Sequence, residues 1–114
     1  MIAYLNDPQL KADMLAELDE HRRLDQIVKG TYGEGTNGDW KGCAVGCAIH
    51  SLNRKRGTKY CTSDHAAYEV GFGIPQVLAR LEDGIFENLP DLVYLDWPKR
   101  FMKAIRPGAD LSLV

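Results

Sequence analysis

Residues 40–50 read Trp40-Lys41-Gly42-Cys43-Ala44-Val45-Gly46-Cys47-Ala48-Ile49-His50, an apolar and short-chained stretch. Cys43, Cys47 and His50 are spaced i, i+4 and i+7, so a helix would place them on one face, within about 60° of one another. We therefore predict a helix over residues 43–53. A run of glycine, alanine and cysteine is typical of a helix that another helix crosses closely, so these cysteines could serve packing alone.

The segment before this stretch has the pattern of a long amphipathic helix. Asp7 can cap the first free N–H groups, and Pro8 suits the first helical position. Apolar side chains then recur every three or four residues as far as Val28, and Gly30 is expected to end the helix. The pattern predicts one helix over residues 8–29.

Residues 30–42 contain five glycines and are expected to form a loop. Tyr32 and Trp40 could anchor this loop onto the core. The glycines match neither a dinucleotide-binding fingerprint nor a P-loop, because no strand pattern precedes them and Lys41 is not followed by serine or threonine. A phosphate-binding loop is therefore not expected here.

Three further helices are expected after the central stretch. Residues 62–64 offer caps for a short helix through His65 and Glu69. Pro75 opens a second amphipathic helix that stops near Pro90. Its inward stripe is predicted to hold Ile74, Val77, Leu78, Leu81, Ile85, Phe86 and Leu89.

A last helix opens at Pro98, capped by Asp96, and the tail that follows it is expected to dock against the body. No segment shows the two-residue alternation of a strand. The predicted fold class is therefore all-α, a single compact domain over residues 1–114 with five or six helices joined by short loops.

Composition excludes several classes of protein. A chain of 114 residues that is 45% apolar can bury a core without metal or disulfide, and a net charge of -2 gives no field that favours nucleic acid or membrane. Three cysteines, an N-terminus without signal-peptide features and the lack of an apolar run near 20 residues predict a cytoplasmic protein with free thiols.

A structural zinc site is one alternative to packing for the cysteines. Cys43 and Cys47 form a Cys-x3-Cys pair, and Cys61 and His65 form a Cys-x3-His pair thirteen residues later. This spacing is close to that of structural zinc sites, and zinc is the one cofactor that the sequence supports. Both pairs fall where helix is expected, whereas zinc knuckles usually turn the chain between paired cysteines.

A thiol-dependent active site is a second alternative. Cys43 would be the nucleophile at a helix N-terminus, where the helix dipole lowers a thiol pKa. His65 would act as its base, and Glu69, four residues later, would orient the imidazole.

Charged residues on two segments are candidate binding surfaces. The basic turn around Arg54, Arg56 and Lys59, together with Trp40, could contact a ligand or phosphates, although a solvated loop has the same composition. Acidic residues Glu82, Asp83, Glu87 and Asp91 are predicted to form a face of opposite sign.

The chain also carries a set of ordered motifs: Gly42-Cys43-Ala44-Val45-Gly46-Cys47, His65 with Tyr68-Glu69, Gly73-Ile74-Pro75, Leu78-Ala79-Arg80-Leu81-Glu82-Asp83, Ile85-Phe86, Leu89-Pro90, Trp97-Pro98 and Gly108-Ala109-Asp110-Leu111. This set resembles a family of small uncharacterised proteins carried by bacteria and their phages, and it covers most of the chain. The resemblance groups Cys43, Cys47 and His65 together and leaves Cys61 and His50 outside the family pattern. It brings no activity with it.

The small size and the lack of a clear catalytic constellation predict a non-enzymatic binding protein, and the resemblance implies an accessory role of the phage or prophage type. Such a protein would block a host or defence factor, or sequester a small ligand, and it could form a homodimer. The alternatives are a thiol-dependent enzyme using Cys43 and His65, and an interaction domain built around structural zinc.

Overall fold

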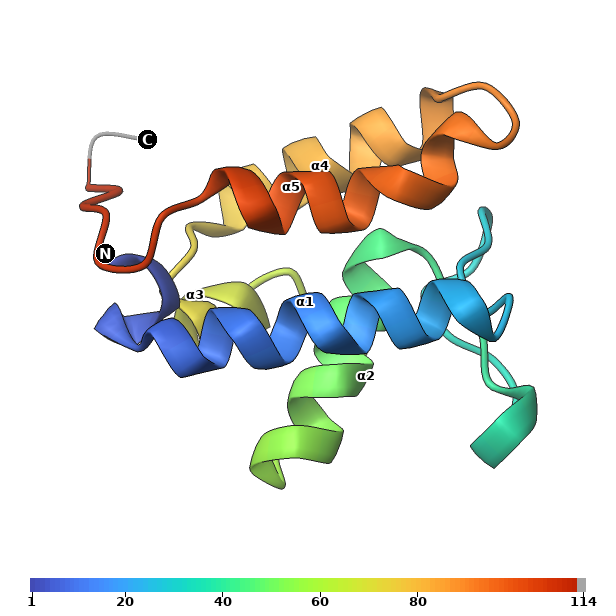
Figure 1. Cartoon of the computed structure of the whole chain (residues 1–114), viewed down its shortest axis with the longest axis horizontal. Helices are drawn as coiled ribbons and strands as arrows, with labels where there is room; N and C mark the ends of the chain where they lie inside the picture. Colours follow the sequence, from blue (N-terminus) through green and yellow to red (C-terminus); the bar gives the residue numbers. More distant parts are fainter. Residues whose placement is uncertain (113–114) are drawn as a thin grey trace.

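The computed structural model describes residues 1–112 and shows an all-α domain (Figure 1). Its α-helices are α1 (Pro8–Arg23), α2 (Ala44–Arg56), α3 (Ala67–Phe72), α4 (Gln76–Asn88) and α5 (Trp97–Ala104). Short 3-10 helices are η1 (Ala3–Asn6), η2 (Asn37–Asp39) and η3 (Val93–Asp96). Within the described residues, β-structure is limited to three isolated bridges. The predicted fold class of five or six helices is confirmed.

Helix α2 is the central element, and it packs against α1, α3, α4 and α5. Figure 1 shows α1 running across α2, while α4 and α5 lie side by side along one edge of the molecule. Residues 44–49 are all buried. Gly46 is required here because a Cβ atom would lie 1.7 Å from the carbonyl oxygen of Tyr32. The close neighbour of this glycine is thus the loop backbone, and the expected crossing helix is not the reason for it.

Helix α1 ends at Arg23, so the predicted helix over residues 8–29 is wrong in its last turns. Asp25 adopts a left-handed conformation with φ of 57°. The N–H of Gln26 then donates to the carbonyl of His21, and the N–H of Asp25 donates to that of Arg22. This is a Schellman end in which aspartate occupies the place usually taken by glycine. The chain beyond it is extended.

The glycine-rich segment forms the predicted loop, fastened by two of the isolated bridges. Ile27 pairs with Gly42, and Glu34 pairs with Lys41. Trp40 is buried at the base of this loop. The loop is thereby held against the N-terminal half of α2.

Helix α4 is rotated relative to its predicted inward stripe. Val77 and Leu81 are exposed, whereas Ala79, Glu82 and Phe86 are buried. Glu82 therefore does not belong to a solvated acidic face, and that part of the prediction is wrong. Its carboxyl accepts the Tyr68 hydroxyl at 2.6 Å inside the core.

The two ends of the described chain are joined by backbone hydrogen bonds. The N–H of Ala3 donates to Ala109, and the N–H of Leu111 donates to Met1. The expected docking of the tail is confirmed as far as residue 112, and residues 113–114 lie outside the described part. None of the described helices is long and apolar enough to cross a membrane.

Candidate functional site: a histidine pocket between α1 and α2

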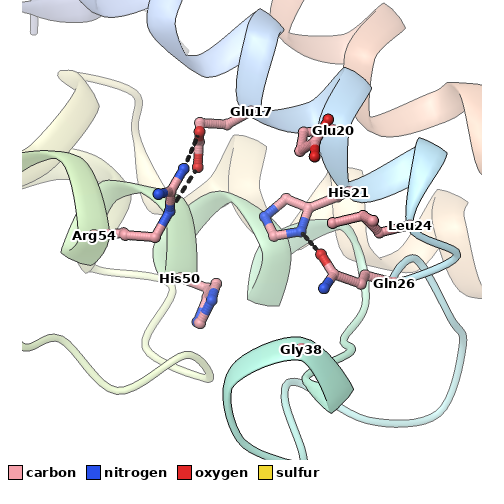
Figure 2. Close-up of a pocket in the computed structure, with 8 residues that line it drawn as sticks. All are labelled: Glu17, Glu20, His21, Leu24, Gln26, Gly38, His50 and Arg54. Carbon is pink, nitrogen blue, oxygen red and sulfur yellow. Dashed lines mark hydrogen bonds and ion pairs between the residues drawn. The ribbon is translucent and has the colours of Figure 1, made fainter.

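A pocket of about 410 Å³ opens between the C-terminal half of α1, the C-terminal half of α2 and the glycine-rich loop (Figure 2). Its polar lining consists of Glu17, Glu20, His21, Gln26, His50 and Arg54. Leu24 and Gly38 complete the lining. The early end of α1 creates this pocket, because the chain must turn back at Asp25 before it can place Gln26 beside His21.

His21 is buried and has both ring nitrogens occupied. Its Nδ1 lies 2.7 Å from the side-chain oxygen of Gln26, and its Nε2 lies 2.7 Å from the Ser51 hydroxyl. An amide oxygen only accepts, so Nδ1 carries the proton and Nε2 accepts from Ser51. Burial lowers the pKa of His21, outweighing the hydrogen bond to Gln26, which acts to raise it. A neutral His21 thus braces α1 against α2.

His50 occupies the opposite side of the pocket and has both ring nitrogens open. Its ring stacks on Trp40 with centroids 3.9 Å apart and planes 11° apart. Burial lowers the pKa of His50, with smaller contributions in the same direction from His21 and Arg54. No hydrogen bond joins its ring to any group in the described part of the chain. His50 therefore offers the pocket a neutral donor and a neutral acceptor.

Two ion pairs frame the pocket. Arg54 binds Glu17 through two hydrogen bonds, from Nε at 3.2 Å and from a terminal nitrogen to the second oxygen (Figure 2). Burial alone would raise the pKa of Glu17, but the hydrogen bonds and the positive charge of Arg54 outweigh it and the pKa is lowered. Glu20 is paired with Arg23 through hydrogen bonds of 2.9 and 2.5 Å. Both carboxylates are charged at neutral pH.

The predicted binding residues divide between the pocket and the surface. Arg54 lines the pocket, and Trp40 lies outside it, stacked on the ring of His50. Arg56 lies instead beside Asp7, 3.4 Å away, and Lys59 is exposed. The predicted basic turn is wrong at Arg54 and Arg56, because α2 continues to Arg56. Acids of the N-terminal region pair with these two arginines, and the structure does not bring the four residues together.

The three cysteines are free and lie in different environments. Cys43 and Cys47 are buried, whereas Cys61 is exposed and lies 3.1 Å from the Ser63 hydroxyl. The predicted ligands Cys43, Cys47, Cys61 and His65 do not converge within the described residues. Zinc binding therefore stays a prediction, and these four residues do not form its site.

Cys43 occupies the N-cap of α2, as the thiol-enzyme hypothesis requires, but its acidity is opposite to the expected one. Burial raises the pKa of Cys43 to about 12, despite a weak hydrogen bond from the Gly46 N–H at 3.5 Å. The side chain is a buried, protonated thiol at neutral pH. It lacks the thiolate character of an activated nucleophile.

His65 has a different carboxylate partner from the predicted one. Its Nε2 lies 3.3 Å from Asp83, which also accepts the Tyr32 hydroxyl at 2.8 Å. Glu69 instead accepts the backbone N–H of Gln76. Asp83 and Glu87, both on α4, also lie close to Cys43. The Cys43 sulfur and one carboxylate oxygen from each acid lie within 4.8 Å of one another. This cluster lies apart from the histidine pocket.

Most of the pocket is not indicated by the sequence pattern, because the helix predicted over residues 8–29 contains both His21 and Gln26. The available signal was the i, i+4 spacing of Glu17 and His21, which places both on one side of a helix. No protein-family model, curated protein or solved structure matches the chain, so its function has to be argued from this geometry.

Proposed function

We propose that this protein is a non-enzymatic binding module that sequesters a small, neutral ligand with a flat heteroaromatic ring, of nucleoside type, in the histidine pocket. The observation that carries the proposal is His50, whose ring is fixed by stacking while its nitrogens stay open. Trp40 does not line the pocket, because the His50 ring covers it. A flat ring on the open side of His50 would extend this stack.

The charges of the pocket favour a neutral ligand. Glu17 is already paired with Arg54, and Glu20 with Arg23. A strongly charged ligand would have to break one of these pairs and leave a carboxylate or guanidinium without its partner. A neutral ring with donors and acceptors along its edge can instead use His50 and the unoccupied amide hydrogens of Gln26.

Sequestration is the mode of action that this pocket supports. Binding needs a preformed concave site, and His21, Gln26 and Ser51 hold each other in place without a ligand. The family resemblance supports a phage- or prophage-type accessory role for such a module. Blockade of a host or defence protein remains a prediction that rests on the resemblance alone.

Titration with nucleosides, followed by calorimetry and by NMR of the histidine rings, tests the proposal. Adenosine, guanosine, cytidine and uridine are the probes, and glucose is the control without an aromatic ring. At least one nucleoside should shift the His50 resonances and bind one molecule per chain.

Two variants separate stacking from hydrogen bonding. His50→Phe keeps a ring on Trp40 but removes both nitrogens, and it should weaken binding by about tenfold or more. Lys59→Ala alters an exposed side chain outside the pocket and should leave binding unchanged. Failure of all four nucleosides to shift His50 at about 1 mM, or wild-type affinity in His50→Phe, would refute the proposal.

A further inference from the structure

Helix α4 exposes an apolar ridge to the outside of the molecule. Val77 and Leu81 are 53% and 54% exposed, and Ile85 is half-buried. Their i, i+4, i+8 spacing forms one continuous row, the kind of ridge that packs into the groove of a neighbouring helix. The core side of the same helix is occupied by Ala79, Glu82 and Phe86, so this ridge is additional to the packed face.

A glycine leaves a depression in the helix surface directly beside the ridge. Gly84 is exposed, and a Cβ atom added to it would meet nothing within 4 Å. Glycine weakens a helix interior relative to alanine, and no contact within the described chain requires it at this position. Its neighbours in the adjacent i+4 row are Arg80 and Asn88. Gly84 therefore leaves open space on this face, beside Asn88, whose side-chain amide donates to the Gly84 carbonyl at 2.7 Å.

Opposite charges flank the ridge on one side. Arg80 and Glu87 are seven residues apart, which places them on the same side of α4, and both are exposed. Neither forms an ion pair within residues 1–112. There the Glu87 carboxylate lies in the cluster with Cys43 and Asp83 and accepts weak hydrogen bonds from the Gly30 N–H, at 3.2 and 3.3 Å. Two copies of this face packed antiparallel would therefore have complementary charges.

We infer that α4 is the interface of a homodimer in which two copies of this helix pack antiparallel across a twofold axis. In this arrangement Leu81 of each chain fills the open space above Gly84 of the partner subunit. The same register brings Arg80 within one helical turn of Glu87 of the partner subunit, on the same side of the interface. Each contact occurs twice, as an isologous interface requires. The inference is independent of the proposed ligand.

Sedimentation equilibrium of the full chain tests the interface. The wild-type protein should show twice the 12.8 kDa chain mass at about 100 µM. Leu81→Glu should be monomeric at the same concentration. The matched control is Val70→Glu, which places the same charge at another exposed apolar residue, on α3, and should remain dimeric. A monomeric wild type, or a dimeric Leu81→Glu, would overturn the inference.

A charge exchange tests the orientation of the two helices. Arg80→Glu and Glu87→Arg alone each place like charges opposite one another and should weaken dimerisation about tenfold. The double variant restores opposite charges and should recover wild-type dimerisation. Glu87→Arg could also act through its contact with Gly30, but only pairing across the interface predicts recovery in the double variant. Absence of recovery would rule out the antiparallel register.

Discussion

Two buried glutamates in this protein have pKa values shifted in opposite directions. Glu17, on α1, is joined to Arg54 by two hydrogen bonds, and its pKa is lowered. Glu82, on α4, receives one hydrogen bond from Tyr68, and its second oxygen has no partner within the described residues. Burial raises the pKa of Glu82 to about 8. Burial of a carboxyl thus does not determine its charge; the partners available at that depth do.

The difference follows from what surrounds each side chain. Glu17 lies at the rim of the pocket, where a guanidinium can reach it while remaining largely in water. Glu82 lies in the core beside Tyr68 and Cys47, which supply no positive charge. One carboxylate is therefore part of a charged surface frame, and the other is a neutral acid at pH 7.

The largest expected effect is the pH dependence of stability caused by Glu82. Its folded pKa lies above its unfolded value of about 4.5, so the folded chain binds more protons between pH 4.5 and about 8. Stability should fall as pH rises through this window, by about 3 to 5 kcal/mol, at roughly 1.4 kcal/mol per pKa unit. Denaturant unfolding at several pH values measures this loss.

Glu82→Gln is the variant that isolates this effect. The amide keeps the shape of the side chain and cannot ionise, so the fall in stability should disappear. Other groups also change charge between pH 5 and 8, and the difference between wild type and variant cancels their contribution. A wild-type profile that stays parallel to that of Glu82→Gln from pH 5 to 8 would show that Glu82 ionises normally.

A smaller effect is expected from removal of the partner of Glu17. Arg54→Ala should cost about 1 to 2 kcal/mol at pH 7, because it leaves a largely buried carboxylate without its guanidinium. The cost should fade as pH falls from about 4.5 through the lowered folded pKa of Glu17, below which Glu17 is protonated in both the folded and the unfolded state. Arg22→Ala, which removes an exposed pair with Asp96, is the control and should change stability little. Equal losses in the two variants would contradict this account.

The smallest effect is expected from Tyr68→Phe. The Tyr68 hydroxyl acts to lower the pKa of Glu82, so its removal should raise that pKa further and cost about 1 kcal/mol. The control is Tyr60→Phe, because no hydrogen bond involves that hydroxyl in the described residues. Thermal unfolding at pH 5 compares the two variants, and an equal stability of both would argue against the Tyr68–Glu82 hydrogen bond.

The helices that begin at clear sequence signals were predicted well. Pro75 and Cys43 mark the starts of α4 and α2 almost to the residue. The end of α1 was missed because Asp25, and not a glycine, takes the left-handed conformation. Residue propensity does not predict that Asp25 adopts this conformation, because the hydrogen bonds of His21 and Gln26 form only after the chain has turned.

The candidate site was harder to predict than the fold. Glu82 resembles a surface residue in the sequence, because its neighbour Asp83 is also acidic and only the rotation of α4 separates them. The residue type of the cysteines made them candidates for a functional site, yet Cys43 and Cys47 lie in the core. The pocket depends on contacts between residues about 30 apart, such as that of His21 with Ser51, and local spacing contains no information about them.

The stacking of Trp40 on His50 gives the protein a built-in optical signal. An imidazolium ring quenches a neighbouring indole, so protonation of His50, or a ring bound on its open side, should change the emission of Trp40. The other tryptophan, Trp97, donates its indole N–H to the backbone carbonyl of Glu82 at 3.0 Å. Each of the two contrasting regions therefore has its own fluorophore. Variants that retain a single tryptophan would let the pocket and the core be followed separately in solution.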